Sequence, residues 1–162
     1  MTKLAQFLGS GYEQKRTNIF TRQFELGGHT FKVRVPLIAE SDEIYKRVME
    51  PDAETIDRLY HEMTDPLQKF KPDATDDSGF VFTETDVLVS GRSMREAAKN
   101  KAMTEARITE YIKLLIPENP DSSLADLTYA DIELEFPMSV QLLLCEKIGE
   151  AISPTYKEAR GN

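Results

Sequence analysis

The sequence has one cysteine, short apolar runs and no apparent secretory signal at its start. Cys145 has no partner for an internal disulfide, and it lies in the run 142–145, where a thiol behaves as a small apolar side chain. This longest apolar run falls far short of the roughly 20 residues of a membrane helix. The first eight residues contain one cation and no sustained apolar core. We therefore expect no membrane segment and a reducing, intracellular location.

Basic residues are fewer than acidic residues: 20 Lys and Arg against 28 Asp and Glu give a net charge of −8. Such a chain repels phosphate backbones, so we expect neither nucleic acid nor an anionic membrane as a partner. Its 162 residues, 40% of them hydrophobic, suit one globular domain. The expected organisation is an N-terminal arm of unassigned order at 1–18, a single mainly helical domain at 19–154 and a polar tail at 155–162.

Two runs rich in β-branched and aromatic residues, Ile19–Leu26 and Thr30–Val35, flank Gly27 and Gly28. Glycine adopts the positive φ of a tight turn, so this pattern predicts a β-hairpin. The second run alternates apolar and charged residues, which predicts one buried face and one solvated face. Its apolar members are Phe31, Val33 and Val35.

Helical spacing follows the hairpin. Two amphipathic helices are predicted on either side of Pro51. Their apolar stripes are Ile44, Tyr45 and Val48, and then Ile56, Leu59, Tyr60 and Met63. We expect a surface loop over residues 66–79, which are rich in proline and acidic residues, and a short strand within Phe80–Val89.

The best-marked helix begins at Ser93, because Ser93 and Glu96 have the spacing of a capping box. Its apolar stripe continues to Ile116 before Pro117 ends it. A short helix over Tyr129–Phe136 and a last one between Pro137 and Pro154 follow. The predicted fold is α+β and mainly helical, an N-terminal β-hairpin followed by a bundle of about four to five α-helices.

Two patterns resemble metal sites only in part. His61 and Glu62 begin a zinc-protease helix motif, but Asp65 replaces its second histidine and Pro66 ends the helix. The calcium-loop positions one, three, five and twelve are occupied, but the sixth holds Ser78 where glycine is needed. The residues at those four positions are Asp73, Thr75, Asp77 and Glu84. We interpret both patterns as solvated surface, with a metal-dependent enzyme as the weakest alternative, and expect no metal or cofactor.

Three cations are spaced to share one face at the start of the long helix: Arg92, Arg95 and Lys99. Cations near a helix N-terminus oppose the macrodipole by a few tenths of a kcal/mol each. They form either a basic contact face or a solvated face balanced by acids such as Glu96.

No Gly-rich phosphate loop and no Ser-His-Asp or Cys-His arrangement is evident, so we expect no enzyme. The last helix is apolar around much of its circumference, because four consecutive apolar residues at 142–145 cannot share one narrow stripe. It is therefore either a core helix or one whose apolar surface a partner covers.

Three segments together resemble tail assembly chaperones of long, non-contractile-tailed, lambda-like bacteriophages, over about residues 19–160. They are Phe24–Pro36, Asp86–Ser93 and Glu146–Pro154. The resemblance implies a protein of the host cell cytoplasm that coats the apolar, helical tape measure protein and keeps it soluble. Such chaperones act in many copies, are absent from the mature virion and recruit tail tube protein through a longer, frameshifted product. The resemblance implies the same properties for this chain.

This role requires exposed apolar surface and enough net charge to keep the complex soluble. We expect the client or subunit contact at Leu142, Leu143, Ile148 and Tyr156. The N-terminal Leu4, Phe7 and Leu8 are the candidates for self-association into a homo-oligomer. A structural virion component, such as a head-tail joining or tail-end protein, is the alternative function.

Overall fold

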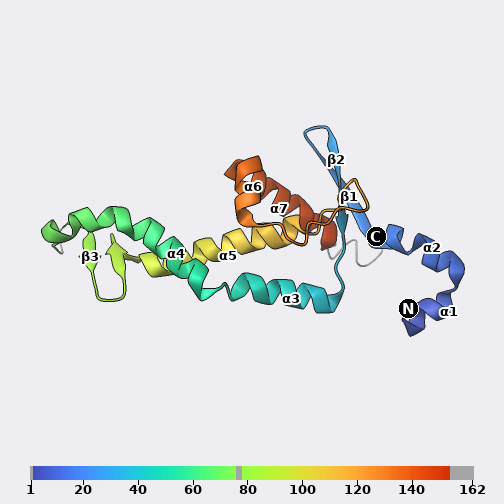
Figure 1. Ribbon diagram of the computed structural model, residues 1–162, viewed down its shortest axis with the longest axis horizontal. Helices are drawn as coiled ribbons and strands as arrows, with labels where there is room; N and C mark the ends of the chain where they lie inside the picture. Colours follow the sequence, from blue (N-terminus) through green and yellow to red (C-terminus); the bar gives the residue numbers. More distant parts are fainter. Residues whose placement is uncertain (1, 76–77, 154–162) are drawn as a thin grey trace. The chain divides into compact units, whose positions relative to one another are not determined.

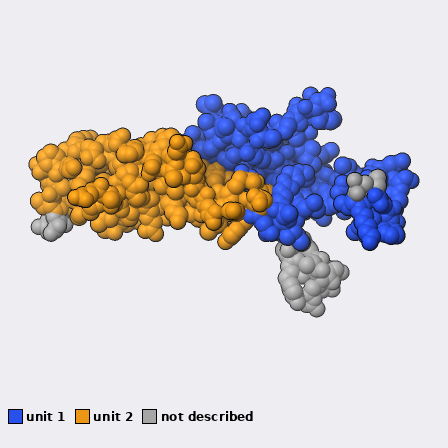
Figure 2. All heavy atoms as spheres, turned by 60° about the horizontal axis from the view of Figure 1, so that its bottom comes forward, with its two compact units in different colours: residues 1–42, 108–162 blue, residues 43–107 orange. Residues whose placement is uncertain are grey.

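The computed structural model describes residues 2–75 and 78–153. The chain is α+β and mainly helical (Figure 1), as the sequence predicted. Its contacts divide it into two compact units, coloured in Figure 2: unit 1 comprises residues 1–42 and 108–162, and unit 2 comprises residues 43–107. The expected single domain, residues 19–154, therefore contains parts of both units. Within the described ranges, no helix is long and apolar enough to cross a bilayer.

Unit 1 begins with two helices, α1 (Lys3–Leu8) and α2 (Ser10–Ile19). The hydroxyl of Thr2 accepts a hydrogen bond from the Ala5 N–H at 3.1 Å and caps α1. Gly9 separates the two helices with a φ of 84°, a value that side chains with a Cβ rarely adopt. The predicted N-terminal arm is thus helical over most of its length.

The predicted hairpin is confirmed. Strands β1 (Thr21–Leu26) and β2 (His29–Arg34) pair antiparallel, with Phe24 opposite Phe31. Gly27 and Gly28 both have positive φ, as a two-residue turn requires. The alternation in β2 also holds, because Val33 is fully buried and its charged neighbours are exposed.

The long helix α5 (Met94–Ile112) ends earlier than predicted. Beyond it the chain pairs with the hairpin edge: the Arg34 N–H donates to the Leu114 carbonyl at 2.9 Å, and the Ile116 N–H donates to the Lys32 carbonyl at 2.8 Å. The prediction of a helix to Ile116 is therefore wrong in its last turn. Strand pairing satisfies backbone groups that a helix end would leave without partners.

Two further helices complete unit 1, α6 (Tyr129–Glu135) and α7 (Met138–Ile152), and both predictions are confirmed. Thr128 and Asp131 form a reciprocal capping box on α6. Helix α7 packs against both strands of the hairpin, and its core side includes the fully buried Leu144 and Ile148. This burial fixes which side of α7 faces solvent.

Gln141 is a buried polar residue on the core side of α7, and both ends of its amide are satisfied. Its Oε1 accepts from the Tyr129 hydroxyl and its Nε2 donates to the Phe136 carbonyl, each at 2.8 Å. A buried amide without partners would cost about 1 to 3 kcal/mol. These bonds therefore hold α6 against α7.

Helix α3 (Ile38–Met49) crosses from unit 1 into unit 2, where it is followed by α4 (Ala53–Thr64). The two predicted amphipathic helices are confirmed. Ile44 is buried, but Tyr45 is 66% exposed, so its assignment to the apolar stripe of α3 is wrong. Successive residues lie about 100° apart around a helix, and Tyr45 falls outside the packed arc.

The predicted loop after α4 begins instead with the 3₁₀ helix η1 (Asp65–Asp73). Pro66 is tolerated in its first turn, because the missing N–H would have no helical partner there. The Phe70 ring stacks on Phe80 with centroids 5.1 Å apart. This contact anchors η1 to the following sheet, and the expectation of a loop from Pro66 is corrected.

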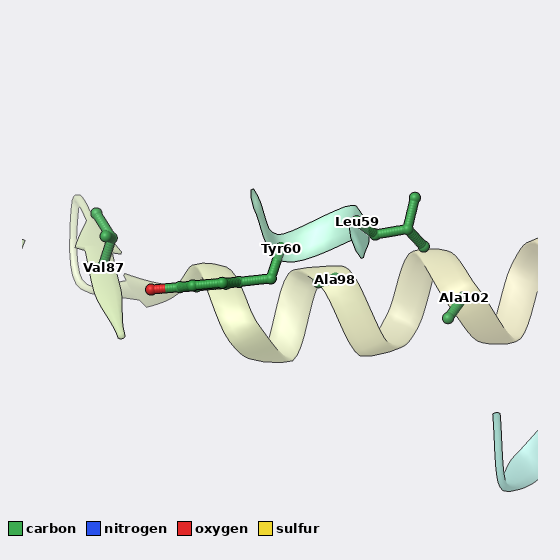
Figure 3. Packing of buried hydrophobic residues seen from close by; sticks show 5 residues of the cluster. All are labelled: Leu59, Tyr60, Val87, Ala98 and Ala102. Atoms are coloured by element: carbon green, nitrogen blue, oxygen red, sulfur yellow. The ribbon is translucent and has the colours of Figure 1, made fainter. Parts of the chain in front are cut away.

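The predicted short strand is one of three. Strands β3 (Phe80–Phe82), β4 (Val87–Val89) and β5 (Arg92–Ser93) form an antiparallel sheet in that order. The core of unit 2 lies where β4, α4 and α5 meet (Figure 3). Its buried members are Leu59, Tyr60, Val87, Ala98 and Ala102. The two alanines place a nearly fully buried part of α5 against this cluster.

Candidate functional site

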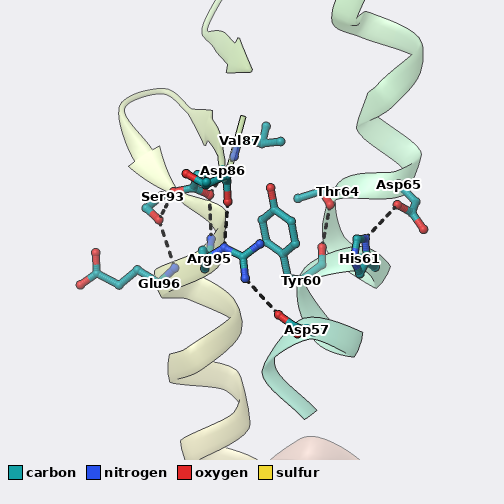
Figure 4. Close-up of polar contacts among 11 residues, drawn as sticks. Asp57, Tyr60, His61, Thr64, Asp65, Asp86, Val87, Ser93, Arg95 and Glu96 are labelled. Carbon is teal, nitrogen blue, oxygen red and sulfur yellow. Dashed lines mark hydrogen bonds and ion pairs between the residues drawn. The ribbon is translucent and has the colours of Figure 1, made fainter. Parts of the chain in front are cut away.

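A polar cluster occupies the start of α5 in unit 2 (Figure 4). The Ser93 hydroxyl accepts from the Glu96 N–H at 3.1 Å, which confirms that half of the predicted capping box. The carboxylate that joins this cap is that of Asp86. It accepts hydrogen bonds from the Ser93 hydroxyl, from the Val87 N–H at 2.7 Å and from the Arg95 N–H at 3.0 Å.

The ionisation of Asp86 reflects these contacts. Burial alone would raise its pKa, but hydrogen bonds from Ser93, Arg95 and Val87, together with the Arg95 charge, outweigh burial and hold the pKa below its ordinary value. Asp86 is therefore a stable anion that organises a helix start. Nothing in this geometry presents it as a general acid or base.

Arg95 is the central residue of the predicted basic face, and its guanidinium makes contacts within unit 2. Its guanidinium lies 4.1 Å from the centroid of the Tyr60 ring, donates from Nη1 to Asp57 at 3.0 Å and donates from Nε to the Thr85 carbonyl at 2.8 Å. These contacts join α5 to α4 and to the β3–β4 loop. Arg95 therefore stabilises unit 2.

Arg92 and Lys99 do not complete the predicted face. Arg92 belongs to β5, so its assignment to a helix face with the other two cations is wrong. Lys99 lies one turn after Arg95 and lines the same surface hollow, but acidic residues share it. They are Asp57, Asp86 and Glu96. This mixture of charges favours the solvated interpretation.

The structure describes all of the zinc-protease-like pattern and part of the calcium-loop-like pattern. His61 and Asp65 approach within 3.6 Å as an exposed pair one helical turn apart. Among the described residues, no three or more His, Cys, Asp and Glu side chains gather in a way that would hold a metal ion. Asp77, one of the calcium-loop positions, lies outside those residues.

The candidates for self-association lie exposed on α1. Phe7 is 79% exposed and Leu4 is 67% exposed, and Leu8 on the same helix is also exposed. Ala5 is the buried residue of this helix. The sequence prediction therefore named side chains that are available for contact.

The candidates for client contact divide into different environments. Leu142 is 49% exposed on α7, and Leu143 is half-buried. Ile148 is fully buried, so its inclusion in a contact surface is wrong: it lies on the core side of α7. Tyr156 lies outside the described residues. Met138, one turn before Leu142, is exposed as well and was not identified from the sequence.

Leu134 on α6 is the most exposed large apolar side chain in the described residues, at 88%. Buried Ile132 precedes it by two positions, about 200° away around the helix, so Leu134 points to the opposite side. Glu133 and Glu135 flank it. In the sequence, Leu134 is a single leucine between two glutamates. The assignment of apolar residues to helix stripes did not include it.

A cavity of about 610 Å³ opens in unit 1 between the end of α2, the hairpin and the start of α3. Its wall combines cations with apolar side chains. The cations are Arg16, Lys32 and Arg34, and the apolar residues include Phe20, Leu37 and Ile116. Sequence analysis did not find this cavity, because its residues come from four separate segments.

The cations of this cavity differ in how they are paired. Arg34 donates to both carboxylate oxygens of Glu40, at 2.6 and 2.7 Å, and these bonds raise its pKa. Arg16 lies with Cζ 5.3 Å from the Phe20 ring centroid, and its buried Nε has no hydrogen-bond partner within the described chain. One donor in the cavity wall is thus left unsatisfied.

The chain matches no protein-family model, no curated protein and no solved structure.

Proposed function

We propose that this chain is a tail assembly chaperone of a long-tailed bacteriophage. In this proposal it acts in the host cytoplasm, binds and solubilises the tape measure protein, helps recruit tail tube subunits through a frameshifted longer product and is absent from the mature virion. The sequence resemblance supports the assignment. The observation that carries it is the exposed apolar pair Met138 and Leu142 on α7, in a chain of net charge −8.

The physical argument concerns how one helix recognises another. Met138 and Leu142 are four residues apart, so they project from the same side of α7 on successive turns. An apolar stripe on a client helix packs against such a pair, and methionine adapts to different client side chains. The acidic surface around the complex keeps it soluble.

The proposal is tested by capture of the client. The double variant Met138→Asp/Leu142→Asp places two charges on the contact and should abolish co-purification of the co-expressed tape measure protein, which then becomes insoluble. Both positions are exposed, so the fold should persist. Pull-down yield and the soluble fraction of the tape measure protein are the measurements.

Ser139→Asp is the matched control, because Ser139 is exposed on the same helix and gains a charge without losing an apolar group. It should retain capture. If the double variant captured the client as well as the wild type does, the α7 contact would be refuted. Mass spectrometry of purified virions tests the wider role, since stoichiometric presence of the chain would favour the virion component instead.

A further inference from the structure

The cavity of unit 1 has the chemistry of a receptor for an acidic, apolar segment. Its cations Arg16 and Lys32 lie beside the apolar Phe20, Leu37 and Ile116. Arg34 is paired with Glu40, whereas the buried Nε of Arg16 has no acceptor among the described residues. In a chain with eight excess negative charges, this basic and partly apolar hollow is well suited to bind an anion.

Helix α6 presents the complementary group on the same chain. Leu134 projects into solvent, and Glu133 and Glu135 lie about 100° to either side of it. The helix is held in place by its Thr128 cap, by buried Ile132 and by the Tyr129 bond to Gln141. It contributes no residue to the wall of the cavity, so this group remains available for a partner.

We propose that the cavity binds α6 of a second copy of this chain. Leu134 of one copy enters the hollow against Phe20, Leu37 and Ile116 of the other. Glu133 and Glu135 then face Arg16 and Lys32. The occupant is argued from complementarity of both charge and apolar surface between two parts of one sequence.

This contact joins two different surfaces, so it is heterologous. Each copy carries both surfaces, so a copy that binds through one of them still offers the other to a further copy. Such contacts build rings or open chains of copies rather than a closed symmetric dimer. The inference goes beyond client binding, which is assigned to α7 and has a separate readout.

The test measures mass by light scattering and sedimentation of the full chain over a range of concentrations. The wild type should increase in mass with concentration, and added salt should reduce this because the contact is charged. Lys32→Glu and Glu133→Lys/Glu135→Lys should each lower the mass. Circular dichroism checks that both variants remain folded.

Mixing the two variants provides the decisive arm. Lys32→Glu keeps an acidic α6, and Glu133→Lys/Glu135→Lys keeps a basic cavity, so a wild-type contact forms between them. The mixture should recover the mass of at least a pair. Lys101→Glu and Glu118→Lys, exposed positions outside both surfaces, are the matched controls and should behave as the wild type.

Three results would overturn the proposal. A wild type that is monomeric at every concentration would exclude a second copy as the occupant. Variants with wild-type mass, or a mixture that stays at the mass of the separate variants, would exclude these two surfaces.

Discussion

At the start of α5, the carboxylate of Asp86 satisfies three donors: the Ser93 hydroxyl and the N–H groups of Val87 and Arg95. Two of these donors lie in the cap of the helix and one lies in β4. Hydrogen bonds to a charged acceptor contribute about 1.5 to 3 kcal/mol each, less where solvent reaches the group. Asp86 therefore links the sheet of unit 2 to its longest helix.

Asp86→Asn should destabilise the protein by about 1 kcal/mol near neutral pH, because a neutral amide oxygen is a weaker hydrogen-bond acceptor than a carboxylate for the same donors. Chemical unfolding followed by circular dichroism measures the change. Glu84→Gln is the control, since Glu84 is an exposed acid close in sequence. An equal loss in both variants would show that Asp86 has no special role.

The stability contributed by Asp86 also depends on pH. Its pKa is lower in the folded state than in the unfolded state, so its contribution is complete above the ordinary carboxyl pKa and is lost as pH falls through the folded value. The difference in unfolding free energy between the wild type and Asp86→Asn should therefore shrink on acidification. A difference that stayed constant would contradict the assigned ionisation.

Residue-scale prediction from the sequence succeeded where the signal was local. The Ser93 cap depends on a residue three positions away, and it is present as expected. Arg95 was singled out as unusual, but its partners Asp57 and Tyr60 lie in α4, far away in the sequence. Because no sequence neighbour explained this cation, a contact face was one of its two interpretations. The structure shows instead that Arg95 makes its contacts within unit 2.

At the scale of elements, α5 enters the core of unit 2 through small residues. Ala98 and Ala102 are buried one turn apart on α5, against the cluster that contains Leu59 and Tyr60 of α4. Close packing leaves no room for added methylene groups, because protein interiors have the density of organic crystals. Positions 98 and 102 of α5 are thus suited to small side chains.

Ala98→Leu should destabilise the protein by about 1 to 3 kcal/mol, because Ala98 is fully buried and the larger side chain forces its neighbours to shift or to adopt strained rotamers. Thermal and urea unfolding measure the loss. Lys101→Leu is the matched control, as it adds a leucine at an exposed position of the same helix and should change stability little. Equal stability of the two variants would argue against close packing at Ala98.

Element-scale prediction found the hairpin, both amphipathic helices, α6 and α7, because each has a repeating apolar pattern or a strong cap. It failed at the end of α5 and at η1. Ile116 continues the helical stripe, yet its N–H bonds to the Lys32 carbonyl of β2. Such a pairing is decided by a distant strand, so local periodicity cannot reveal it.

At the scale of the whole molecule, strong negative charge is combined with exposed apolar side chains on α1, α6 and α7. Net charge opposes nonspecific aggregation, whereas apolar groups promote particular contacts. The proposals assign α7 to the client and α6 to a second copy. The exposed apolar residues of α1 form the predicted self-association surface.

The variant Leu4→Ser/Phe7→Ser/Leu8→Ser should reduce the mass of assemblies, because it removes the exposed apolar surface of α1. Unlike the contact between the cavity and α6, this contribution should persist in added salt, since apolar burial is not screened. Light scattering at low and high salt measures it, with Gln6→Ser as the control. Unchanged assembly would assign α1 another role.

The sequence by itself determined the α+β class, most elements and the acidic surface, because these follow from local periodicity, caps and composition. Tertiary structure decided which apolar residues are available: Ile148 is buried and Leu142 is exposed on the same helix. It also assembled the cavity from Arg16, Lys32 and Ile116, which are distant in the chain. Exposure and proximity depend on packing between elements, and a linear pattern does not contain that information.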